Sequence, residues 1–141
     1  MKLSEEERNL VVVHRLQKAK DTLREAKGNI DLGYWHTAAN RLYYACYYAT
    51  SALLIKYEHS PQTHSGVIGL FGEHFVSKGI VSKEAGKLYR KLFELRQTGD
   101  YNDWINIEAA DIQPLVIPAE EYICLLEKLI LTKPIPTSPI P

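Results

Sequence analysis

The sequence of 141 residues contains only two cysteines, no excess of charge and no long apolar run. Cys46 and Cys124 lie in separate apolar stretches without the Cys-x-x-Cys spacing of metal or redox sites, so we expect both to be reduced core residues. Lys and Arg number 17 and so do Asp and Glu, which argues against a generally basic nucleic-acid or membrane coat but allows a local basic pocket. The most apolar run, residues 42–55, is too short to span a bilayer and predicts a buried helix.

The two ends of the sequence differ in composition from the segments between them. The first ten residues are acidic and lack an apolar segment, so no signal peptide is predicted, and we expect a cytoplasmic protein that does not bind membranes. Residues 132–141 alternate proline with small residues, a composition that cannot continue a helix and predicts a flexible tail. Residues 1–131 have the length of one domain, and a hydrophobic content of 45% suits a globular fold.

Apolar residues recur at helical spacing through most of the sequence, and no segment of useful length alternates like a half-buried strand. Ser4 and Glu7 have the spacing of a capping box, which marks the start of a first helix. Pro118 is expected to kink the last helix or delay its start. These patterns predict an all-α protein, an up-and-down bundle of four main helices with one additional short helix. The expected helices cover about residues 4–29, 34–57, 67–79, 83–98 and 109–131.

The stretch LFELRQTGDYNDW, residues 92–104, begins as the apolar edge of a helix and then gathers polar groups around one glycine. Gly99 can adopt the left-handed conformation that ends a helix, so we predict that the fourth helix stops there. Asp100 and Tyr101 would then point away from the helix axis. A site at such a terminus can project several side chains into one cleft.

Arg96 is the candidate centre of this stretch. Its guanidinium offers a planar fork for two phosphate oxygens, while Asp100 could orient the arginine or accept a proton. Tyr101 could donate to a phosphate or stack on a base. The plainer interpretation is a surface ion pair between Arg96 and Asp100, which are four residues apart on a helix and would add little stability.

Three residues outside this stretch are candidates for the same site. Arg41 is a lone charge in an apolar helix, so it needs either an ion pair with an acid of another helix or a phosphate ligand beside Arg96. Tyr44 belongs to a tyrosine stripe typical of a core or dimer interface, and its hydroxyl is the one most expected to line a pocket. His64 either bonds nearby backbone or completes the site around Arg96. Neither a metal site nor a cofactor is predicted, because the remaining histidines have no partner at metal spacing.

Three fragments in this order, RLYYACYYATSALL, HSGVIGLFGEHFV and LFELRQTGDYND, resemble the HEPN domain family. The likeness is to the bacterial and archaeal branch with Arg-x-Tyr-Tyr-Ala, His-Ser-Gly-Val and Arg-Gln-x-Gly-Asp-Tyr motifs, and it covers roughly residues 5–130. It implies a helical bundle that pairs as a homodimer. Many members are metal-independent ribonucleases of toxin–antitoxin and other defence systems. Others are non-catalytic partners of small nucleotidyltransferases, and the family is proposed to bind nucleotides.

The chain departs from the ribonuclease motif of that family, which is Arg followed by four to six residues and then His. A gap of four residues after Arg96 leads to Tyr101, a gap of six leads to Asp103, and no histidine follows anywhere downstream. We therefore favour a defence component that binds nucleotide or RNA phosphate around Arg96 and acts with a small nucleotidyltransferase partner. The alternatives are a metal-independent endoribonuclease that uses Arg96 with a non-histidine base, and a non-catalytic dimerising module.

Overall fold

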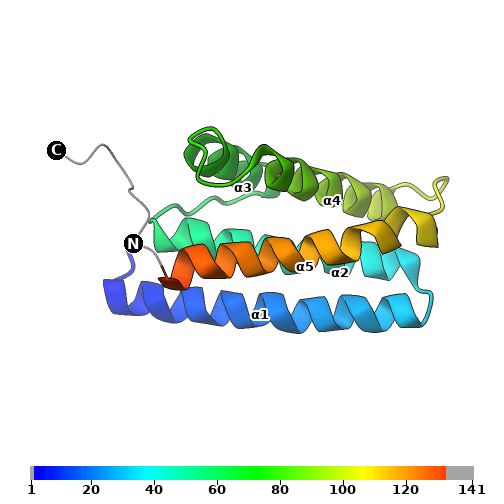
Figure 1. Ribbon diagram of the computed structural model, residues 1–141, viewed down its shortest axis with the longest axis horizontal. Coiled ribbons are helices and arrows are strands. Elements are labelled where there is room, and N and C mark those ends of the chain that lie inside the picture. The colour runs from blue at the N-terminus through cyan, green and yellow to red at the C-terminus, as the bar shows by residue number, and fades with distance from the viewer. Residues whose placement is uncertain (1, 133–141) are drawn as a thin grey trace.

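The computed structural model of the chain describes residues 2–132, which form five α-helices and one π-helical turn. The direction of the long helices alternates along the chain, so they form an up-and-down bundle, to which α3 and η1 are the short addition (Figure 1). No strand occurs in the described residues, and the predicted fold class is confirmed. The elements are α1 (Glu5–Asp31), α2 (Trp35–Lys56), α3 (His64–Phe71), η1 (Gly72–Val76), α4 (Lys83–Tyr101) and α5 (Ala109–Thr132).

Helix starts follow the local sequence closely. The Ser4 hydroxyl accepts a hydrogen bond from the Glu7 amide at 3.1 Å and the Glu7 carboxylate accepts one from the Ser4 amide at 2.8 Å, so the predicted capping box is present. Ser82 caps α4 in the same way. Thr63 caps α3, which therefore begins at His64, three residues before the start that apolar spacing predicts.

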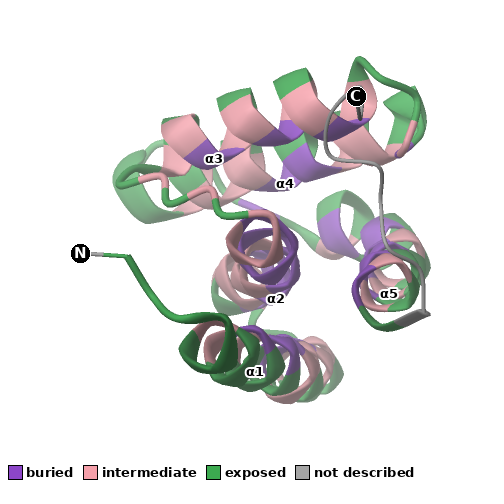
Figure 2. Ribbon diagram, turned by 90° about the vertical axis from the view of Figure 1, so that its left-hand side faces the viewer, coloured by how far each residue is buried: buried purple, intermediate pink, exposed green. Residues whose placement is uncertain are grey.

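Helix α2 lies in the middle of the bundle, with α1 on one side, α5 beside it, and α3 and α4 across the opposite face (Figure 2). Its alanine stripe is fully buried, because small side chains let neighbouring helices approach closely. Tyr43, Tyr89 and Phe71 are the largest side chains buried around it. The stripe consists of Ala38, Ala45, Ala49 and Ala52.

The predicted stop at Gly99 is wrong. Helix α4 continues to Tyr101, and Gly99 does not adopt a positive φ, unlike Gly33 and Gly79. A Cβ at Gly99 would lie 2.7 Å from Cδ1 of Ile107, so a larger residue at this position would displace the Ile107 side chain, which comes from the segment before α5. The polar stretch around Arg96 therefore lies on the last turn of a helix and in the loop that follows it.

Helix α5 has the predicted start and corrects the expectation for one cysteine. It begins at Ala109 with Pro114 and Pro118 inside it, so Pro118 does not delay its start. Cys124 is exposed on this helix, whereas Cys46 is buried in the core as predicted, and both thiols are free. From residue 133 onward the predicted tail lies outside the described residues. Across residues 2–132, no helix combines the length and the apolar character needed to cross a bilayer.

Candidate functional site

Arg96 joins α4 to α2 through its guanidinium. Its Nη2 donates a hydrogen bond of 3.0 Å to the hydroxyl of Tyr44. Its Nε lies 3.1 Å from Oδ2 of Asp100, so the two side chains form an ion pair. The geometry of this contact is not that of a hydrogen bond, and the buried Nε makes no hydrogen bond within the described residues. The Arg96 side chain is 11% exposed, so the predicted ion pair is present but is more buried than a surface pair.

Aromatic rings enclose the same guanidinium. The Cζ atom of Arg96 lies 5.3 Å from the ring centroid of Tyr44, 5.8 Å from that of Tyr43 and 5.5 Å from that of Tyr101. The negative faces of such rings attract a cation while leaving its formal charge unchanged. Tyr101 contributes through its ring alone, because its side chain is largely exposed and its hydroxyl makes no hydrogen bond within residues 2–132.

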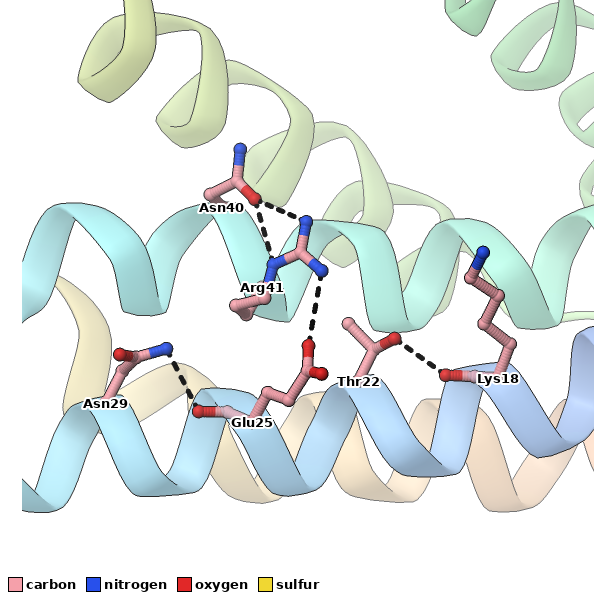
Figure 3. Close-up of polar contacts among 6 residues, drawn as sticks. All are labelled: Lys18, Thr22, Glu25, Asn29, Asn40 and Arg41. Atoms are coloured by element: carbon pink, nitrogen blue, oxygen red, sulfur yellow. Dashed lines mark hydrogen bonds and ion pairs between the residues drawn. The ribbon is translucent and has the colours of Figure 1, made fainter.

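Asn40 connects the two predicted arginines. Its Nδ2 donates to Oδ2 of Asp100 at 2.9 Å, while its Oδ1 accepts from Nε and Nη2 of Arg41 at 3.0 and 2.8 Å. Arg41 also bonds Glu25 of α1 at 3.3 Å, so the predicted ion pair with an acid of another helix exists (Figure 3). No sequence signal marks Asn40, because an amide within a helix has many possible partners.

Two tyrosine rings of α2 hold cations from three helices. The Tyr44 ring lies 5.3 Å from the Cζ atoms of both Arg41 and Arg96. One turn further along α2, the Tyr48 ring lies 4.9 Å from Nζ of Lys18 and 5.9 Å from Cζ of Arg15. We call these four cations the tyrosine-held row: Arg15, Lys18, Arg41 and Arg96.

The tyrosine-held row keeps a net positive charge. Its four cations have ion pairs with two carboxylates, Glu25 and Asp100, which leaves a charge of +2 in a chain of zero net charge. The other basic residues of the second half of α1 each have a direct carboxylate partner. These pairs are Lys20 with Glu127, Arg24 with Asp21 and Lys27 with Glu120.

A cavity of about 330 Å³ borders one end of the row. Its lining includes the cations Lys18 and Arg41 and the carboxylates Asp21 and Glu25, and Figure 3 shows Lys18, Glu25 and Arg41 between α1 and α2. Arg96 is not among its lining residues. The cavity is therefore lined by Arg41, the predicted second phosphate ligand, but not by Arg96, the predicted centre of the site.

His64 lies beside this arrangement at the start of α3. Its Nδ1 is 2.6 Å from the Tyr43 hydroxyl, and its ring centroid is 5.7 Å from that of Tyr44 and 4.9 Å from that of Tyr47. Burial, and secondarily the positive charge of Arg96, lower the pKa of His64. The expected bond to nearby backbone is absent from the described contacts, and the histidine faces the aromatic side chains around Arg96.

The arrangement is better supplied with hydrogen-bond donors than with bases. Metal-independent RNA cleavage needs a base for the ribose 2′-hydroxyl, an acid for the leaving oxygen and a cation for the phosphorane. Arg96 provides the cation. Asp100 is already engaged by Arg96 and Asn40, and burial raises the pKa of Tyr43 to about 12. Within residues 2–132, no three metal-binding side chains gather at one point.

Comparison with known proteins matches most of this chain. The HEPN domain family matches residues 12–129. A UPF0332 protein of Thermotoga maritima is 37% identical over 124 residues, 88% of this chain and 94% of that protein. A protein of Methanocaldococcus jannaschii named "Putative toxin" is 26% identical over 118 residues, 84% of this chain and 80% of that protein. The crystal structure of TT1696 from Thermus thermophilus has the same fold, with a TM-score of 0.71 at 17% identity over 83% of this chain and 96% of that one.

Proposed function

Because the chain belongs to the HEPN domain family, we propose that it acts in a toxin–antitoxin or defence system and binds nucleotide or RNA phosphate around Arg96. Relatives that carry the word toxin in their names support the first part. The tyrosine-held row supports the second part. Arg41 and Arg96 are each paired with a carboxylate, whereas Arg15 and Lys18 have no carboxylate partner within residues 2–132 and rest against the Tyr48 ring, so the row as a whole keeps positive charge for an anionic ligand.

The row is extended, which suits a nucleic-acid backbone. Arg41, Tyr44 and Tyr48 lie along one side of α2 within eight residues, and seven steps with a rise of 1.5 Å each give a length of roughly 10 Å. Arg41 meets the 330 Å³ cavity, so this part of the row has room beside it. Phosphates that bind along the row would contact Arg41 and Lys18 directly. The more buried Arg96, which lies against the Tyr44 ring, would attract them through its charge.

Salt-dependent binding tests this proposal. The full chain is titrated into a labelled single-stranded RNA of mixed sequence, and anisotropy is recorded at several salt concentrations. Lys18→Gln should weaken binding and reduce the slope of log affinity against log salt by about 0.7, the value expected for one lost phosphate contact. Lys87→Gln is the matched control, because Lys87 is also exposed and has no ion pair within the described residues. Equal slopes in both variants, or no binding by the wild type, would contradict the proposal.

An exposed apolar group next to Arg96 supports a protein partner. Trp104 is 95% exposed, and its neighbours in the sequence Tyr101 and Ile105 are 73% and 46% exposed. Large apolar side chains gathered at one place on a surface mark contact sites. We therefore propose that the chain forms a cytoplasmic homodimer and works with a small nucleotidyltransferase, with this group in one of the contacts.

The oligomeric state tests the dimer directly. Wild-type protein and Trp104→Ser are compared by sedimentation velocity over a range of concentrations. A dimer in the wild type that weakens in the variant is expected if Trp104 lies in the dimer contact. A dimer that Trp104→Ser leaves unaffected would indicate that the exposed group around Trp104 contacts the nucleotidyltransferase instead. A wild-type protein that is monomeric at all concentrations would refute the homodimer. A small nucleotidyltransferase in the neighbouring reading frame would support the second partner.

The ribonuclease alternative has one observation in its favour, which is that the fold brings His64 close enough to Arg96 for the two to interact electrostatically. Incubation of the protein with mixed RNA in EDTA tests it, with Arg96→Ala as the variant. Cleavage by the wild type and its loss in Arg96→Ala would establish the activity. No cleavage by either protein, together with flat RNA titrations, would leave the non-catalytic dimerising module.

A further inference from the structure

A chain of hydroxyl groups runs from the core of the bundle to His64. The Tyr89 hydroxyl lies 3.4 Å from the Tyr43 hydroxyl, which lies 2.6 Å from Nδ1 of His64. Tyr89 is 1% exposed, and Tyr43 is fully buried. Within residues 2–132, Tyr43 is the only hydrogen-bond partner of the Tyr89 hydroxyl. The direction of these bonds decides which ring nitrogen of His64 carries its proton.

Two arrangements of protons fit the distances when His64 is neutral. In the first, Tyr89 donates to Tyr43 and Tyr43 donates to Nδ1 of His64, so each hydroxyl proton has an acceptor. In the second, Nδ1–H donates to Tyr43; then either Tyr43 donates to Tyr89 and the Tyr89 proton has no acceptor, or Tyr89 donates to Tyr43 and the Tyr43 proton has none. An unpaired buried donor is costly, so the first arrangement is favoured. In that arrangement Nδ1 is bare and the proton sits on Nε2.

We propose that Tyr43, supported by Tyr89, is a positioning residue that fixes neutral His64 as the Nε2–H tautomer, so that His64 meets a phosphate as a hydrogen-bond donor. Nε2 points away from Nδ1 across the imidazole ring, and it makes no hydrogen bond within the described residues. The lowered pKa of His64 keeps the ring in this neutral form near pH 7.

The tautomer determines what the site can do. The Tyr44 hydroxyl accepts a bond from Arg96, so its own proton is free to be donated. Arg96 and His64 both lie beside the Tyr44 ring. Cζ of Arg96 is 5.3 Å from the centroid of that ring, and the imidazole centroid of His64 is 5.7 Å from it. Three donor groups thus lie around the Tyr44 ring, and an Nε2 that carries its proton cannot accept one from a ribose hydroxyl. This part of the inference rests on the proposed function and specifies its ligand as a phosphate oxyanion held by neutral and cationic donors.

Nitrogen NMR of the full ¹⁵N-labelled chain tests the tautomer without any ligand. At a pH above the pKa of His64, we expect Nδ1 to resonate as an unprotonated nitrogen and Nε2 as a protonated one. Tyr43→Phe should give a tautomer mixture and raise the pKa of His64, because it removes a donor that stabilises the neutral ring. Tyr47→Phe is the matched control, since its ring lies 4.9 Å from that of His64 but makes no hydrogen bond to it.

The opposite results would overturn the positioning role. A wild-type Nδ1–H tautomer would do so by itself, and this measurement remains decisive if Tyr43→Phe fails to fold. A fall in the pKa of His64 in Tyr43→Phe would also do so, because it would mean that His64 donates to Tyr43. If Tyr43→Phe and Tyr47→Phe change the tautomer and the pKa of His64 equally, Tyr43 contributes only by packing and not through its hydroxyl.

A phosphate titration separates the positioning role from the proposed function. Inorganic phosphate should shift the His64 resonances, and His64→Ala should weaken its binding by about tenfold or more, the loss expected for a hydrogen bond to a charged group. His64→Gln, which keeps an N–H donor, should recover part of the affinity. If phosphate leaves the spectrum unchanged while the Nε2–H tautomer is present, the donor role and phosphate binding at this site are both refuted, and the tautomer assignment stands.

Discussion

The hydroxyls of Thr50 and Tyr122 lie 2.7 Å apart between α2 and α5, where both side chains are almost fully buried. Thr50 also donates to the carbonyl oxygen of Cys46 at 2.7 Å, so the proton between the two hydroxyls belongs to Tyr122. Burial raises the pKa of Tyr122, which keeps that proton in place. The pair gives the apolar core one directed contact between its central helix and α5.

Removing the acceptor should therefore cost more than removing the donor. Thr50→Val is expected to lower the free energy of unfolding by about 1 to 3 kcal/mol, because it leaves the Tyr122 hydroxyl buried without a partner. Tyr122→Phe should cost about 1 kcal/mol, since Thr50 retains its bond to Cys46. Urea unfolding of the two single variants and the double variant measures this difference. Additive losses in the double variant would show that the two hydroxyls are not coupled.

Gly99→Ala should destabilise the protein despite the better helix propensity of alanine. Alanine gains up to about 1 kcal/mol over glycine within a helix, but the new methyl group would press on Cδ1 of the buried Ile107, and overpacking typically costs about 1 to 3 kcal/mol. Ile107→Val removes the colliding atom, so Gly99→Ala should be neutral or stabilising in that background. Thermal and urea unfolding of the four proteins would detect this change of sign, and its absence would contradict the close approach.

Stability should fall as the pH drops below about 6.5. Burial, then the neighbouring His74, lower the pKa of His59, whose ring stacks on that of His74 with centroids 4.3 Å apart. Glu73 opposes this shift and Lys78 adds to it. Because the unfolded chain binds protons at the ordinary histidine pKa of 6.5 and the folded chain only at a lower one, stability is lost as the pH falls through the folded-state value.

The lowered pKa of His64 adds to this pH dependence in the same direction. Thermal unfolding at pH 7.5 and 5.5 should show a smaller loss in His59→Gln than in the wild type. His14→Gln is the control, because His14 is exposed and makes no hydrogen bond among the described residues. A loss of the same size in the wild type and in His59→Gln would show that the stacked pair does not contribute.

Charge removal from the carboxylates of the site should strengthen anion binding. Asp100→Asn and Glu25→Gln each remove one negative charge next to the tyrosine-held row, so RNA affinity should increase several-fold at low salt and less at high salt. Glu127→Gln, which acts on Lys20 away from the row, is the matched control. Anisotropy titrations that find the same affinity in all three variants would argue against the row as the binding surface.

The sequence predicts the fold well because its information is local. The capping residues Ser4 and Ser82 and the alanine stripe of α2 each act within a few residues or on one helix face, and the structure shows all of them. The stop at Gly99 could not be predicted correctly, because the contact that favours glycine there is with the side chain of Ile107, across the loop that follows α4. A glycine in a sequence does not reveal whether it serves a turn or a close approach.

Specific pairs of the site were predictable only where both residues share a helix; for Arg41, an ion pair with an acid of another helix was predicted, but not that the acid is Glu25. Arg96 and Asp100 are four residues apart, and their pairing follows from helix geometry. The bond from Arg96 to Tyr44 spans 52 positions in the sequence, and the bond from Asn40 to Asp100 spans 60. Such pairings depend on how α2 and α4 pack, and the tyrosine stripe alone does not say which ring faces a cation.

The two thiols offer a practical consequence of their unequal burial. Cys46 is sealed in the core, where burial strongly raises its pKa, whereas Cys124 is open to solvent on α5. A maleimide dye should therefore attach to the native chain at one place, without any engineered cysteine. Energy transfer between donor- and acceptor-labelled copies would then report assembly and subunit exchange in an unaltered protein.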